Sequence, residues 1–130
     1  MPATEQTHLI PQSLRTWFII HFYLDILFGL PLLLIPTITL GLFGWESIDP
    51  ATTRLVGAAL MGIGVESFLA RNKGIETFRG MLNLKLIWSA SAVLGIILSL
   101  IDGAPPMTWM FLIIFASFFG IWFYYRLKLK

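Results

Sequence analysis

The sequence contains no cysteine. This absence excludes disulfide bonds, thiolate metal sites, palmitoylation and covalent haem attachment, and it leaves the redox state of the compartment undetermined. Charged residues are also scarce, because Asp, Glu, Lys and Arg make up only 12% of the chain, about half of their share in a soluble domain. The net charge of +2 is small and the basic residues are scattered. The composition therefore argues against a nucleic-acid-binding surface and points to lipid as the solvent.

Long hydrophobic runs take the place of the missing charge. The chain is 57% hydrophobic and its mean hydropathy is +0.81. A membrane-spanning helix needs about 20 mostly apolar residues. Segments of this kind cover about residues 14–35, 50–70, 75–101 and 107–125. We therefore predict an all-α fold, an integral membrane four-helix bundle that forms a single domain over residues 1–130.

The basic residues that flank these spans favour one orientation. Lys and Arg accumulate on the cytoplasmic side of a membrane protein. In a four-span chain, one side collects Arg15, Arg71, Lys73, Arg79, Arg126, Lys128 and Lys130. The other side carries Glu46, Asp49 and Asp102 with Arg54. We therefore expect a multi-pass protein of the cell membrane with both termini in the cytoplasm.

Small residues predict how the helices pack. Ala58 and Gly62 lie four residues apart in the second span, followed by Glu66 at the same spacing, so all three share one helix face. Ser89 and Ala92 form a comparable stripe in the third span. Small side chains let a neighbouring helix approach closely. We expect these faces to organise the bundle.

Ionisable residues inside apolar spans are the candidate binding or proton-relay residues. They are His21, Asp25, Glu66 and Lys85. His21 and Asp25 lie four positions apart and share a helix face, and all four residues fall at a similar depth in the cytoplasmic half of the predicted bundle. With a neutral imidazole, the two carboxylates and the lysine sum to one negative charge. Since ionisable groups at membrane depth usually pair with each other or line a pathway, we expect one buried cluster.

A pattern of glycines, prolines and a few other residues runs through the first half of the chain: the segment from Gly29 through Pro31 to Pro36, then Gly41, Gly44, Arg54, Gly57, Ala58, Leu60, Gly62, Gly64, Ala70 and Arg71. In this pattern the chain resembles small uncharacterised four-helix bacterial membrane proteins. His21 and Asp25 are not part of the pattern. The family implies a four-helix fold but carries no assigned activity and no functional residue.

Several functions fit these features. The one we favour is a non-enzymatic accessory, assembly or lipid-interacting membrane protein, because the sequence shows no nucleophile motif, metal-ligand set or phosphate loop and implies no cofactor. One alternative is a proton- or ion-coupled transporter or channel that works as an oligomer. Another is a membrane enzyme acting on a lipid or quinone, with His21 as a base oriented by Asp25. The expected partners are the lipid bilayer, with further copies of the chain or a larger membrane protein as candidates.

Overall fold

The computed structural model describes residues 9–129, and within that range the chain forms five helices and no strand. The long helices are α2 (Gln12–Leu34), α4 (Pro50–Ala70), α5 (Ile75–Ile101) and α6 (Thr108–Lys128), and a short helix, α3 (Pro36–Leu42), follows α2. The all-α prediction is thus confirmed for this part of the chain, whereas α3 was not expected. Lys130, which contributed to the predicted orientation, lies outside the described residues.

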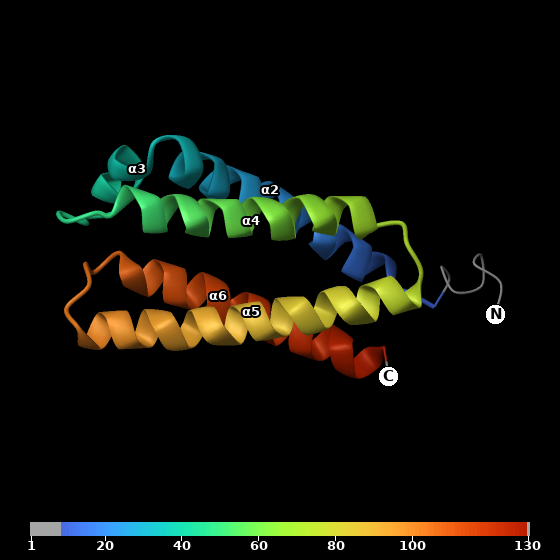
Figure 1. Ribbon diagram of the computed structural model, residues 1–130. Coiled ribbons are helices and arrows are strands. Elements are labelled where there is room, and N and C mark those ends of the chain that lie inside the picture. The colour runs from blue at the N-terminus through green and yellow to red at the C-terminus, as the bar shows by residue number, and fades with distance from the viewer. Residues whose placement is uncertain (1–8, 130) are drawn as a thin grey trace.

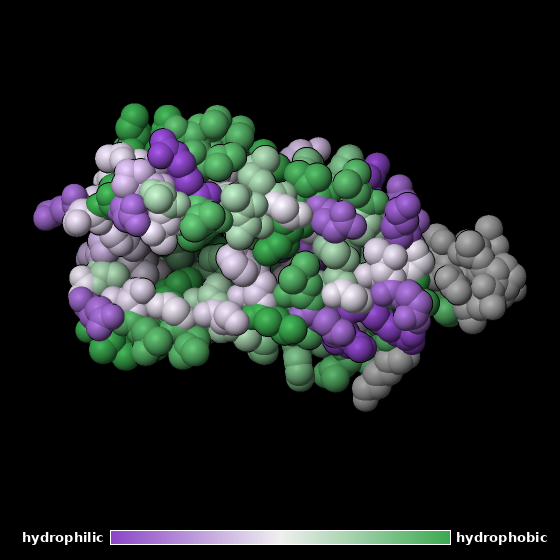
Figure 2. All heavy atoms as spheres, in the orientation of Figure 1, coloured by the Kyte–Doolittle hydropathy of each residue, from purple (hydrophilic) through white to green (hydrophobic). Residues whose placement is uncertain are grey.

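Each of the four long helices is long and apolar enough to cross a membrane. Their bounds lie within three residues of the predicted spans. Large apolar side chains point outward along them, as in Leu55 of α4 and Ile87 of α5, which are 71% and 68% exposed. Figure 2 shows hydrophobic side chains over much of one face, with most hydrophilic ones toward its two ends. Such a surface is stable where lipid surrounds the protein.

Prolines and a capping aspartate set two of the helix boundaries. Ile35 leaves the helical region, at φ −134° and ψ 60°, because a following proline disfavours helical backbone at the preceding residue. Pro36 then begins α3. Before α4, the carboxylate of Asp49 accepts from the Thr52 hydroxyl and from the backbone N–H of Ala51. These two hydrogen bonds, chiefly the one from Thr52, lower the pKa of Asp49 and stabilise the start of α4.

The long helices form two antiparallel pairs. α2 packs mainly against α4, and α5 mainly against α6, while direct contact between α4 and α5 is slight. Figure 1 shows the two pairs lying one above the other, with the beginning of α2 and the end of α6 at the same end of the molecule. The α4–α5 connection lies at that end as well.

The buried core fills only one end of this arrangement. It gathers the beginnings of α2 and α5 and the ends of α4 and α6, including Phe18, Phe78, Leu82 and Trp122. The rings of Phe18 and Phe78 stack with centroids 4.5 Å apart, which joins α2 to α5. Toward the opposite end, a cavity replaces this packing between the pairs.

Candidate functional site

Lys85 of α5 lies where the four long helices meet. Its side chain is fully buried. Nζ lies 2.5 Å from Oγ of Ser67 on α4, to which it donates, and 2.5 Å from Nδ1 of His21 on α2. The ammonium group also faces the rings of Phe18 on α2 and Trp122 on α6, at 4.7 and 4.8 Å from their centroids. Because these contacts replace water around the charge, a lysine is tolerated in an apolar interior.

The imidazole of His21 connects Lys85 to Asp25. A lysine ammonium only donates, so Nδ1 of His21 accepts and the ring proton resides on Nε2. Nε2 lies 3.4 Å from Oδ1 of Asp25, one helical turn further along α2. The chain of groups therefore runs from a cation on α5, through a neutral ring, to a carboxylate on α2. We call His21, Asp25, Ser67 and Lys85 the polar cluster.

Gly64 of α4 makes room for the aspartate of this cluster. A Cβ atom at residue 64 would lie 2.6 Å from Cβ of Asp25, which is closer than atoms can pack. Gly57, two helical turns earlier, makes room for the backbone of α2. A Cβ at residue 57 would lie 2.7 Å from the backbone nitrogen of Leu33 and 2.8 Å from the carbonyl oxygen of Gly29. Glycines thus bring α2 and α4 into backbone contact and place Asp25 against α4.

The structure does not bring Glu66 to the polar cluster. Ala58, Gly62 and Glu66 all lie on the exposed face of α4, and a Cβ at Gly62 would meet no atom within 4 Å. Within the described chain, the glycines that contact α2 lie on a neighbouring face of the same helix. Both faces carry small residues at helical spacing, so spacing alone does not distinguish them.

The position of Glu66 also changes the charge of the cluster. Without it, the cluster contains one cation and one carboxylate, Lys85 and Asp25, joined through a neutral imidazole. The expected excess of one negative charge arose from counting Glu66 as buried. The described cluster is balanced, which lowers the cost of holding it in an apolar interior.

Ser89 and Ala92 of α5 differ in their surroundings. Ser89 is buried, and its hydroxyl donates to the carbonyl oxygen of Lys85 at 2.7 Å, within its own helix. Ala92 is only half-buried. Ser67 was not singled out from the sequence as a cluster member, although it lies three residues after Gly64 on the face of α4 that packs against the rest of the protein.

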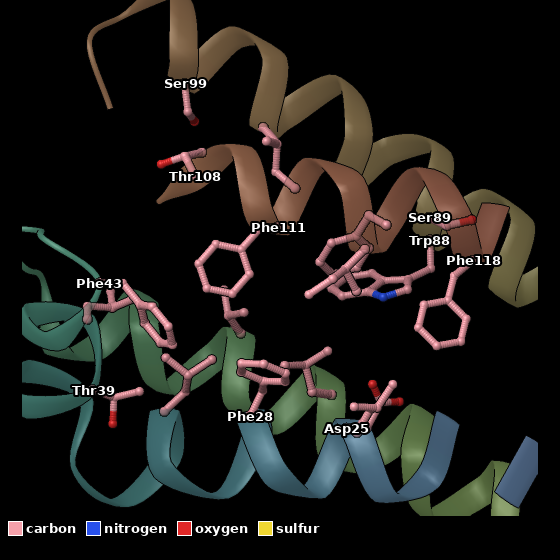
Figure 3. A pocket seen from close by; sticks show the side chains of 18 of the residues that line it. Asp25, Phe28, Thr39, Phe43, Trp88, Ser89, Ser99, Thr108, Phe111 and Phe118 are labelled. Carbon is pink, nitrogen blue, oxygen red and sulfur yellow. The ribbon is translucent and has the colours of Figure 1, made fainter. Parts of the chain in front are cut away.

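A cavity of about 240 Å³ extends from the polar cluster toward the end of the molecule opposite the core. Its lining comes from both helix pairs, from α3 and from the segment that follows it, and is mostly apolar and aromatic. Figure 3 shows the labelled residues around this space, with Asp25 and Phe28 rising from α2 and Trp88, Phe111 and Phe118 facing them from α5 and α6. His21, Asp25 and Ser89 line its inner end.

The cavity reaches the surface of the protein. Val56 of α4 belongs to its lining and is 44% exposed. Figure 2 shows a hollow between the two halves of the molecule, at the end away from the chain termini. The site is therefore a concave, largely apolar pocket with a few polar groups at one end, which is the usual form of a small-molecule site.

Within residues 9–129, His, Asp and Glu side chains do not gather in any group of three that could hold a metal ion. No protein-family model, curated protein or solved structure matches the chain. The function is therefore argued from the geometry of the cavity and the polar cluster.

Proposed function

We propose that the chain is a non-enzymatic, lipid-interacting protein of the cell membrane, with four spans and both termini in the cytoplasm. In this proposal, the cavity between the helix pairs holds one lipid-type molecule and the polar cluster fixes the helices around it. The observation that carries the proposal is the cavity, because it is apolar, enclosed by both helix pairs and open to the surface beside α4. In a bilayer that opening faces acyl chains, which gives a lipid direct access.

The packing around Lys85 favours this function over proton-coupled transport. On the side of Lys85 that faces the end of the molecule with the chain termini lies the core of aromatic and aliphatic side chains, which includes Phe18, Phe78 and Leu82. A proton pathway needs polar groups or water on both sides of the relay. The polar cluster instead borders a cavity on one side and closely packed apolar side chains on the other.

A pair of neighbouring residues tests the lipid site. Ile114 lines the cavity, whereas Ile113 points outward and is 64% exposed. Ile114→Trp fills the cavity, so we expect this variant to lose the lipid that the wild-type chain retains through purification in mild detergent. Ile113→Trp adds the same bulk on the lipid-facing surface and should retain it. Extraction and mass spectrometry give the amount of lipid per chain, and equal amounts in all three proteins would contradict the proposed function.

The absence of cysteine gives a clean background for testing the orientation. We expect single cysteines at Ser47 and Gly103, in the α3–α4 and α5–α6 connections, to react with a membrane-impermeant maleimide added to intact cells. A cysteine at Asn72, in the α4–α5 connection, should react only after the membrane is permeabilised. The reverse pattern would show that the charge asymmetry had been assigned to the wrong side.

A further inference from the structure

Polar atoms without a partner mark the two ends of the cavity. Within the described part of the chain, the buried side-chain atoms that make no hydrogen bond are Oδ2 of Asp25, Nε1 of Trp88 and Oγ1 of Thr108. All three residues line the cavity. Asp25 is 5% exposed and Thr108 is 2% exposed, so bulk solvent does not solvate these groups. Buried polar atoms in native proteins are nearly always paired, and this coincidence therefore points to a ligand.

We propose that the cavity binds a neutral lipophilic molecule that carries a phenol-type hydroxyl group, held between Asp25 and Trp88. The assignment rests on the proposed function, since it names the class of molecule that the lipid site accepts. The ring of the ligand lies among the aromatic side chains of the cavity, and its apolar remainder leaves through the opening beside Val56.

The hydrogen-bonding capacity at the inner end selects the hydroxyl group. Nδ1 of His21 faces Nζ of Lys85, Nε2 lies 3.4 Å from Oδ1 of Asp25, and Ser89 donates to its own helix. The free atoms are then Oδ2 of Asp25, which accepts, and Nε1 of Trp88, which donates. A hydroxyl group satisfies both, because it donates to the carboxylate and accepts from the indole. A ketone only accepts, an ammonium group only donates, and a carboxylate would be repelled by Asp25.

The lining selects a ring over a saturated chain. Phe28, Phe111, Phe115 and Trp88 line the cavity, and Phe118 and Trp122 lie at its inner end beside His21. Aromatic rings pack favourably against one another in edge-to-face and offset arrangements. The volume of about 240 Å³ exceeds the roughly 150 Å³ of an engineered cavity that admits benzene. A substituted ring or a two-ring phenol therefore fits.

Three matched probes test the assignment in the full-length protein reconstituted into nanodiscs. They are 4-bromo-4′-hydroxybiphenyl, its methoxy analogue and 4-bromobiphenyl. Bromine quenches nearby tryptophan, and Trp45, Trp88 and Trp122 line the cavity. We expect the hydroxyl probe to bind about tenfold more tightly than the methoxy probe, since only the hydroxyl donates to the carboxylate. Affinities are corrected for partitioning into the lipid with empty nanodiscs.

Two variants separate the roles of the polar atoms. Asp25→Asn removes the charged acceptor, so the preference for hydroxyl over methoxy should fall to less than about threefold. Trp88→Phe removes the indole donor and should weaken the hydroxyl and methoxy probes alike, with little effect on 4-bromobiphenyl. Trp109→Phe is the control, because Trp109 is 57% exposed and lies outside the cavity. Since Trp88→Phe leaves the polar cluster intact, it remains informative if Asp25→Asn fails to fold.

Equal affinities of the three probes for the wild-type protein would overturn the assignment and leave a cavity that accepts any apolar chain. Affinities unchanged by Trp88→Phe would overturn it as well. The result does not depend on orientation in the cell. Equal lipid retention by the Ile114→Trp and Ile113→Trp variants with an intact hydroxyl preference would overturn only the proposed function, whereas selective loss of lipid from Ile114→Trp with equal probe affinities would overturn only the ligand class.

Discussion

Lys85 links more of the protein than any other residue of the polar cluster. It contacts Ser67 of α4, His21 and Phe18 of α2, and Trp122 of α6. Its charge is balanced by Asp25 through the imidazole of His21. The contributions of these side chains to the free energy of unfolding are therefore coupled, because removal of one side chain leaves the others buried and incompletely paired.

Substitution of this lysine tests that dependence. We expect Lys85→Met to lower the free energy of unfolding by about 3 kcal/mol, because the carboxylate of Asp25 stays buried without its cation. Lys73→Met, at an exposed position in the α4–α5 connection, should change it by less than about 0.5 kcal/mol. Denaturation in detergent, followed by circular dichroism, measures both. The double variant with Asp25→Asn should recover part of the loss, and strictly additive effects would contradict the coupling.

The ionisable members of the polar cluster were identifiable from the sequence because such residues stand out in apolar runs. The structure brings His21, Asp25 and Lys85 together. Ser67 and Trp88 were not recognised as part of the site, because serine and tryptophan are ordinary residues in membrane helices and their importance depends on what they face. Glu66 shows the converse error. Its depth was estimated from the sequence, but depth along a helix does not determine the face on which a side chain lies.

At the level of helices, the contact between α2 and α4 depends on glycines that bring the two backbones together. A Cβ at Gly57 would lie within 3 Å of backbone atoms of Leu33 and Gly29, and backbone atoms cannot rotate away as a side chain can. A Cβ at Gly62, on another face of the same helix, would meet nothing within 4 Å. Comparison of the same substitution at Gly57 and at Gly62 therefore separates the effect of close helix packing from the effect of the low helix propensity of glycine.

Alanine at these two positions should have opposite effects. We expect Gly57→Ala to lower the free energy of unfolding by about 1–3 kcal/mol, because α2 and α4 must move apart. Gly62→Ala should leave it unchanged or raise it by up to about 1 kcal/mol, because alanine is the better helix former. Thermal unfolding of the two variants in the same detergent provides the comparison. Equal destabilisation would show that the glycine face does not control the approach of the helices.

The ends of the helices were predictable, but their rotation about their own axes was not. Hydrophobic length and proline signals place α4 and α5 at the predicted residues. In a water-soluble protein, polar side chains mark the outward face of a helix. Here apolar residues such as Leu55 and Ile87 occupy the outward faces, so polarity does not separate inside from outside. Small residues remain as the packing signal, and α4 carries them on more than one face.

Across the whole molecule, packing is uneven along the helix axes. At the end that holds the chain termini, aromatic side chains join the helix pairs, and Arg15 of α2 donates to the backbone carbonyl groups of Arg71 and Lys73 in the α4–α5 connection. At the other end, the cavity lies between the pairs. Phe111 of α6 also contacts the rings of Phe28, Phe43 and Trp45 at this end, so aromatic contacts join the pairs on both sides of the cavity, whereas the buried polar contacts between the pairs lie at the polar cluster.

This distribution predicts how a divided chain behaves. Residues 1–72 contain α2, α3 and α4, and residues 73–130 contain α5 and α6, so each fragment keeps its own helix pair. Helices that have inserted separately can still associate through side-chain packing within the bilayer. We expect the two fragments, when coexpressed, to purify together through an affinity tag on one of them.

The substitution Lys85→Met should reduce recovery of the partner fragment at least about fivefold, since Lys85 lies in the second fragment and contacts α2 and α4 of the first. Ile87→Met, at an exposed position on the same helix, should leave recovery unchanged. Equal recovery with Lys85→Met would show that apolar packing alone unites the pairs, and the polar cluster would then serve the cavity without holding the molecule together.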